Sequence, residues 1–117
     1  MARSYHHGAL AEAMVEQALA DVRVYGADHV SLRGIAQSLD VSPSAAYNHF
    51  ADKDALLQAV GTCGLASLDE RMARVLAAHS RDTPASARAR FAGLGRAYVS
   101  FAIEEPHLFR LTFSPTC

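Results

Sequence analysis

The chain has 117 residues, of which 50% are hydrophobic and 20% are charged. This length allows one domain of ordinary size, or a small domain with an attached segment, and the apolar fraction is sufficient for a buried core. No apolar run approaches the length of a membrane span, the N-terminus lacks the apolar segment of a signal peptide, and the net charge of −1 does not by itself favour nucleic acid. We therefore expect a cytoplasmic protein, and the two cysteines, which have no metal-ligand spacing, fit a reducing compartment.

The first predicted element is a helix from Ala9 to about Tyr25. Its apolar residues recur at helical spacing, and its acidic residues are turned outward, as in a helix that supports a core on one side. Gly26 stands just past its end, where glycine commonly closes a helix. Residues 27–29 then form a short link, and residues 1–7 precede the helix as an arm in which Arg3 could reach a phosphate.

A short amphipathic helix is predicted from Leu32 to Leu39. Ser31 before it can act as the N-cap by accepting a hydrogen bond from the backbone of Arg33 or Gly34. Val30 and Ile35 have the spacing of a hydrophobic staple. A helix this short must pack against other elements to be stable.

A second short helix begins after Ser42, which is followed by Pro43 at the first helical position. Ala46 and Phe50 share one face of this helix, whereas Ser44 and Asn48 point the opposite way. Two short helices joined by about three residues, the second with a small and polar outer face, indicate a helix-turn-helix whose second helix fits the DNA major groove.

The segment from Leu39 to Val60 resembles the DNA-binding segment of the TetR family of bacterial transcriptional regulators. The family pattern has a turn, an aromatic triplet, a lysine and leucines, and the matching residues here are Tyr47, His49, Phe50, Lys53, Leu56 and Leu57. The opening SYHHGAL and the later PHLFRLTF are similar to segments of one subgroup of that family. The turn glycine of the family is Asp40 in this chain, a residue that tolerates a left-handed backbone better than most others.

Three further helices are predicted after the motif. They comprise a long helix capped by Asp52 that reaches about Ala78, a helix at 85–103 preceded by Thr83 and Pro84, and a short helix at 107–113. Gly61 and Gly64 indicate a bend or a close helix contact in the long helix. The helix at 85–103 is apolar on both sides, which is typical of a central helix.

The fold class is therefore predicted to be all-α. We assign residues 1–52 to a three-helix, helix-turn-helix DNA-binding domain, and residues 53–117 to a long connecting helix with a partial helical regulatory domain for ligand binding and dimerisation. The resemblance implies a sequence-specific transcriptional regulator, most often a repressor released by a small molecule, that binds a palindromic double-stranded operator as a homodimer. No cofactor, membrane association or enzymatic activity is expected.

The resemblance and the spacing together identify residues that we expect to contact DNA. Tyr47, His49 and Lys53 match positions that contact phosphates, and Arg33 could make a bidentate contact with guanine. Small residues on the second helix would read bases, with Asn48 suited to adenine. The complete set is Ser31, Arg33, Ser42, Pro43, Ser44, Ala45, Tyr47, Asn48, His49 and Lys53.

Charge argues against this assignment, because DNA-binding modules are usually basic. Residues 1–58 contain four basic and seven acidic side chains, a net charge of −3, and the remainder contains seven arginines and five acids, a net charge of +2. We therefore expect weak non-specific DNA binding and reliance on a dimer.

The resemblance also implies an effector pocket between the later helices, although the same apolar stripe could be plain core. The candidate lining residues are Cys63, Phe91, Tyr98, Phe101 and Phe109. The adjacent His6 and His7 have no further ligands nearby, so no metal site is expected. No nucleophile and base are arranged for catalysis, and no glycine-rich phosphate loop is present.

Two other classes remain open at this stage. One is an interaction protein, a regulator fragment that pairs through apolar faces of the last helices and binds DNA poorly. The other is a small-molecule-binding protein without DNA contact. Since residues 85–113 would expose unusually apolar faces in a monomer, we expect self-association in each case.

Overall fold

The computed structural model describes residues 8–80 and 82–114, and these residues form helices joined by short turns. The order is α1 (Ala9–Tyr25), the 3₁₀ turn η1 (Ala27–His29), α2 (Leu32–Ser38), α3 (Pro43–His49), α4 (Lys53–Ala78), α5 (Pro84–Glu104) and α6 (Pro106–Thr112). The all-α prediction is confirmed. None of the helices in the described ranges has the length and apolarity that crossing a membrane requires.

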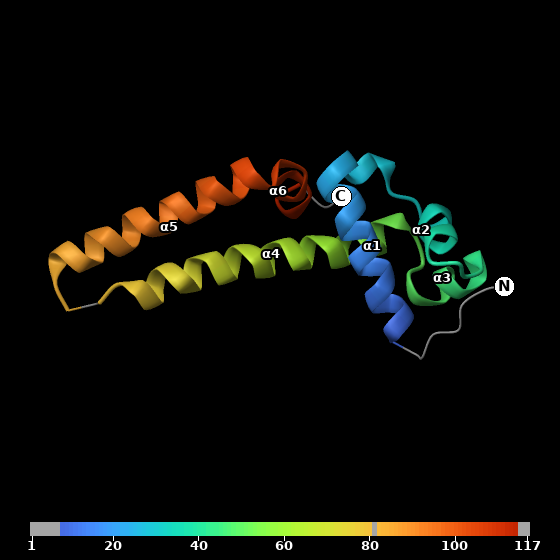
Figure 1. Ribbon diagram of the computed structural model, residues 1–117, viewed down its shortest axis with the longest axis horizontal. Coiled ribbons are helices and arrows are strands. Elements are labelled where there is room, and N and C mark those ends of the chain that lie inside the picture. Colours follow the sequence, from blue (N-terminus) through green and yellow to red (C-terminus); the bar gives the residue numbers. More distant parts are fainter. Residues whose placement is uncertain (1–7, 81, 115–117) are drawn as a thin grey trace.

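The molecule is elongated, with principal extents of 61 × 27 × 24 Å. Figure 1 shows α1, α2 and α3 gathered at one end, while α4 and α5 run side by side as a two-helix arm that projects from them. The chain returns along α5, and α6 packs against α1 and α4 at the base of the arm. The arm thus has one end in contact with the N-terminal helices and one end far from them.

The core lies where α1, α2, α3 and the first half of α4 meet. Helix α1 contributes one buried residue per turn, and α4 enters the same cluster through Leu56 and Val60, both 0% exposed. From the later helices, Phe101 and Leu108 join this cluster. The core is therefore continuous from the N-terminal helices to α6.

Side-chain caps fix the starts of four helices. The hydroxyl of Ser31 accepts a hydrogen bond from the Gly34 N–H at 3.0 Å, and the hydroxyl of Ser42 accepts one from the Ala45 N–H at 3.2 Å. Asp52 caps α4 and Thr83 caps α5 in the same way. All four caps were predicted from the sequence, and the ends of α1 and α4 match the predicted ones.

The two glycines of α4 differ in their surroundings. A Cβ on Gly64 would contact the hydroxyl of Thr112 and lie 3.2 Å from the Leu108 side chain, so α6 approaches the α4 backbone closely there. A Cβ on Gly61 would meet nothing within 4 Å. The predicted close helix contact is therefore found at Gly64 and not at Gly61.

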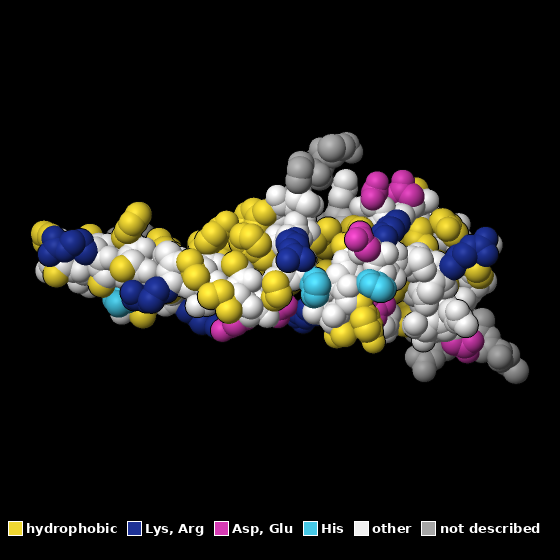
Figure 2. All heavy atoms as spheres, turned by 90° about the horizontal axis from the view of Figure 1, so that it is seen from above, with side chains coloured by type: hydrophobic (Ala, Val, Ile, Leu, Met, Phe, Trp, Pro, Cys, Tyr) yellow, Lys and Arg dark blue, Asp and Glu magenta, His cyan; other side chains and the backbone are white. Residues whose placement is uncertain are grey.

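Helix α5 is not a central helix in this structure, contrary to the prediction. Phe91 is 81% exposed, Ile103 is 73% exposed and Val99 is 53% exposed. A two-helix arm offers α5 only one neighbouring helix over most of its length, so the stripe opposite α4 stays uncovered. The view onto the arm in Figure 2 shows hydrophobic side chains gathered along it.

Candidate nucleic-acid interface

The turn between α2 and α3 has the left-handed backbone that the sequence suggested. Asp40 has φ 56°, the one positive φ among described residues other than glycine. The turn is closed by hydrogen bonds from the Asp40 N–H to the Gln37 carbonyl at 3.1 Å and from the Val41 N–H to the Ala36 carbonyl at 3.0 Å. This turn sets the angle at which α3 leaves α2.

One side of α3 is held against the core, and the other faces solvent. Ala46 is 0% exposed and packs with Ile35 and Ala36 of α2, each 1% exposed. The opposite side of α3 consists of short or polar side chains. The packing of the buried side keeps these side chains turned toward solvent. Its exposed residues are Pro43, Ser44, Tyr47 and Asn48, with Ser42 at the cap and Ala45 half-buried beside them.

Polar and basic groups flank this face of α3. Arg33 is exposed in the first turn of α2, and His49 is half-buried in the last turn of α3. Lys53 is half-buried at the start of α4, where its Nζ donates a hydrogen bond to the Asp28 carbonyl oxygen at 3.2 Å. No local sequence pattern predicted this contact, which links α4 to η1 across 25 residues.

The residues predicted to line an effector pocket lie in different surroundings. Phe101 is 0% exposed in the core, and its ring centroid lies 6.1 Å from that of Phe109. Tyr98 packs on the edge of Phe109 at 5.5 Å, and Cys63 is half-buried on α4. Phe91 is separate from them because it points to solvent on α5.

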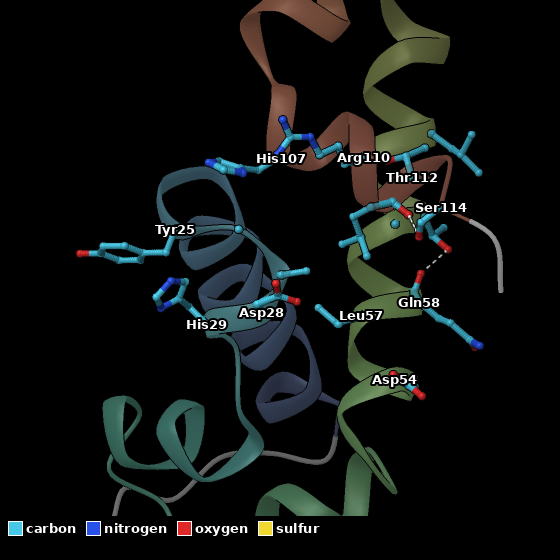
Figure 3. Close-up of a pocket in the computed structure, with 16 residues that line it drawn as sticks. Tyr25, Asp28, His29, Asp54, Leu57, Gln58, His107, Arg110, Thr112 and Ser114 are labelled. Atoms are coloured by element: carbon cyan, nitrogen blue, oxygen red, sulfur yellow. Dashed lines mark hydrogen bonds between the residues drawn. The ribbon is translucent and has the colours of Figure 1, made fainter. Parts of the chain in front are cut away.

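A groove lies elsewhere, between η1, α4 and α6 (Figure 3). Its polar lining includes Tyr25, His29, His107 and Arg110, residues that the sequence did not bring together. They come from segments about 80 positions apart, and no local pattern marks them. Only the packing of α6 on α1 and α4 makes them neighbours.

Arg3, His6 and His7 lie outside the described residues. Within 8–80 and 82–114, no three His, Cys, Asp or Glu side chains are grouped so as to hold a metal ion.

Part of the sequence matches a known protein family. Residues 16–60 match the family model described as bacterial regulatory proteins, tetR family. The match supports a TetR-family regulator. The match runs from the middle of α1 through α2 and α3 into α4, so it contains every residue of the α3 face described above.

Nearly the whole chain is also similar to part of a protein of known structure. A solved structure described as "Structure of a protein with unknown function from Rhodococcus sp. RHA1" shares 36% identity with this chain and superposes with a TM-score of 0.78. The alignment covers 95% of this chain and 55% of that chain, so the present chain spans about half the length of the solved one. No match was found among curated protein sequences. The matched family is one of bacterial regulatory proteins.

Proposed function

We propose that the chain is a sequence-specific DNA-binding regulator that inserts α3 into the major groove. The observation that carries the proposal is the exposed face of α3, small and polar, backed by the fully buried Ala46. Short side chains allow a helix backbone to come close to base edges. In this proposal residues 1–52 are the DNA-binding domain and residues 53–117 are the connecting helix and regulatory segment, in a cytoplasmic protein.

Base reading is assigned to the outer face of α3. Asn48 can donate to N7 and accept from the N6 amino group of adenine, and Pro43, Ser44 and Ala45 would contact base edges or thymine methyl groups. Arg33, exposed on α2, has the fork geometry for a bidentate contact with guanine.

Phosphate contacts are assigned to the groups around α3. The hydroxyls of Ser31 and Ser42 accept backbone hydrogen bonds, so each still has a proton to donate to a phosphate oxygen. Lys53 has three donors, of which the Asp28 carbonyl takes one. Tyr47 and His49 are also assigned to phosphate contacts.

Two copies are needed because one copy offers little electrostatic affinity. The net charge of −3 over residues 1–58 opposes non-specific attraction to phosphates, and pairing two α3 helices on half-sites one turn apart multiplies the specific contacts. The exposed apolar side chains of α5 support a homodimer through the arm, since apolar patches of this kind commonly mark interaction surfaces.

Regulation is proposed to follow the usual family behaviour. The protein would act as a repressor of a palindromic operator, and an effector that changes the placement of α4 would release it. A second candidate is an interaction protein that pairs through α5 and binds DNA weakly. It is favoured by the same negative charge and exposed α5 face, and a test of DNA binding separates the two.

The test combines the mass of the purified protein in solution with selection from a random double-stranded DNA library at low and moderate salt. A dimer that enriches a palindrome, with affinity falling steeply as salt rises, supports the regulator. A protein that enriches no sequence at either salt concentration overturns it and leaves the interaction protein.

Variants of the selected complex then test the residue assignments. Lys53→Ala should weaken binding to all sequences alike and reduce the salt slope by about 1, whereas Asn48→Ala should relax preference at one base pair. Arg74→Ala, at an exposed position in the outer half of α4, is the matched control for loss of a positive charge far from α3. A uniform loss of binding from Asn48→Ala would contradict its assignment to base reading.

A further inference from the structure

The groove between η1, the first half of α4 and α6 has the dimensions of a small-molecule site. Its volume is about 880 Å³, and ligand pockets in proteins commonly enclose about 300–1,000 Å³. Figure 3 shows its walls, with Tyr25, Asp28 and His29 on one side, Leu57 and Gln58 on α4, and His107 and Arg110 on α6. One wall thus belongs to the N-terminal helices and the other two belong to the arm and α6.

The lining of the groove includes apolar side chains that the core covers only in part. Leu57 and Leu111 are half-buried along it, and Leu65, one of its lining residues, is 51% exposed. Gly61 lies between the two leucines of α4 on the groove side, with open space where its side chain would be. An apolar ligand body of moderate size would cover these leucines and remove them from water.

The α6 rim of the groove carries nitrogen-containing side chains. The His107 ring packs over Gly26, where a Cβ would lie 3.2 Å from its Nδ1 and where φ of +88° favours glycine. Arg110 projects beside His107. None of the ion pairs formed within residues 8–80 and 82–114 involves Arg110. Among the described residues no carboxylate pairs with its guanidinium, which leaves its donors for a ligand.

The acidic residues of the groove lie at its other end. Asp28 belongs to η1, next to the Lys53 ammonium that bonds its carbonyl, and Asp54 lies in the first turn of α4, where the helix N-terminus favours a negative charge. In Figure 3 both lie lower in the view than Arg110 and His107. A short anionic head at the α6 rim would avoid them.

We propose that this groove binds a small organic anion, with its carboxylate or similar group on Arg110 and His107 and its apolar body along Leu57, Leu65 and Leu111. It differs from the effector pocket expected from the sequence, whose residues pack in or near the core or point to solvent. Because the ligand would touch η1 and α6 at once, its binding changes how the DNA-binding helices sit on the arm. That consequence for DNA rests on the proposed function, whereas ligand binding itself does not.

The experiment measures binding without DNA, so the ligand site and the DNA-binding proposal can fail separately. The full chain is titrated into dansylglycine, a fluorescent anion with an apolar body, and into dansylcadaverine, which carries the same fluorophore and a positive charge. Saturable, blue-shifted fluorescence is expected for dansylglycine, with dansylcadaverine bound at least about tenfold more weakly because Arg110 cannot pair with it. Preferential binding of dansylcadaverine, or no saturable binding of either probe, overturns the proposal.

Two pairs of variants locate the bound probe. Arg110→Ala should weaken dansylglycine binding about tenfold, and Arg96→Ala, which removes an exposed arginine of α5, should leave it unchanged. Gly61→Leu should abolish binding by filling the groove, since a side chain there meets no neighbour, and Gly61→Ala should change it less than about threefold. Circular dichroism checks that each variant is folded. Binding that survives both Arg110→Ala and Gly61→Leu would place the probe elsewhere and overturn the assignment.

Discussion

The two ends of the molecule are built from similarly apolar helices but bury them to very different extents. In α1, every fourth residue from Leu10 to Val22 is buried, whereas between Leu68 and Phe101 Gly93 is the one described residue that is buried. The N-terminal helices have neighbours on several sides, and the outer part of the arm has only two helices facing each other. An apolar pattern thus shows that a surface needs a partner, and the tertiary arrangement decides whether the partner lies in the same chain.

The different burial of the two ends explains why the protein is expected to self-associate. A pair of helices can bury only the stripe of each that faces the other. Gly93 marks that stripe on α5, because a Cβ there would lie 2.6 Å from the Val75 side chain of α4. On the opposite side of α5, Phe91, Val99 and Ile103 remain in contact with water.

The largest predicted effect compares two phenylalanines of the same helix. Phe101→Ala should lower the free energy of unfolding by about 3–5 kcal/mol, because the ring is 0% exposed and its removal leaves a cavity beside Phe109. Phe91→Ala should change it by less than about 0.5 kcal/mol, because that ring is 81% exposed. Urea denaturation at low protein concentration, where self-association is weakest, provides both values. Equal losses would show that the arm is packed far more tightly than its exposure indicates.

A charge on the uncovered side of α5 tests its role in self-association. Phe91→Glu should raise the dissociation constant of the dimer at least about tenfold, since burying an unpaired carboxylate in an apolar contact costs more than about 1.4 kcal/mol. Val24→Glu is the matched control, because Val24 is an exposed valine, at 65%, near the end of α1. Sedimentation equilibrium measures both. If Val24→Glu weakens the dimer and Phe91→Glu does not, the interface lies on the N-terminal helices instead.

The two glycines of α4 give a smaller and more local contrast. Gly64→Ala should destabilise the protein by about 1–3 kcal/mol, because the added Cβ is forced against Thr112 and Leu108 of α6. Gly61→Ala should stabilise it by up to about 1 kcal/mol, because alanine is the better helix former and nothing obstructs its methyl group. Thermal unfolding of the two variants side by side checks the signs. Stabilisation by both would mean that α6 shifts away from α4 readily.

Local signals accounted for much of the fold before the structure was known. The caps at Ser31, Ser42, Asp52 and Thr83 each depend on a residue and the three that follow it. The local sequence therefore predicts where those helices start. The small outer face of α3 was likewise predicted from helical spacing. The assignments of its residues to DNA contacts stay predictions.

Long-range features were not available from the sequence. The hydrogen bond from Lys53 to the Asp28 carbonyl, the salt bridge between Arg23 and Glu105 at 3.1 Å, and the approach of His107 to Gly26 all join distant segments. The exposure of α5 was missed for the same reason, because periodicity identifies apolar sides and not what covers them. The groove beside α6 likewise brings together residues of η1, α4 and α6 that are distant in the sequence.

The smallest predicted effect concerns the turn between α2 and α3, at the well-packed N-terminal end of the molecule. Asp40 holds φ 56° without being glycine, and such a backbone costs an L-residue roughly 1–2 kcal/mol, less for Asp than for most. Asp40→Gly removes that strain but adds chain entropy to the unfolded state, so the net gain in unfolding free energy should be only about 0.5 kcal/mol. Asp40→Ala keeps the Cβ and should destabilise by about 1 kcal/mol, giving the pair opposite signs. Both values come from urea denaturation. A turn that tolerates alanine as well as glycine would mean that α2 and α3 can adjust their angle, and that the packing of Ala46 holds α3 less firmly than its burial indicates.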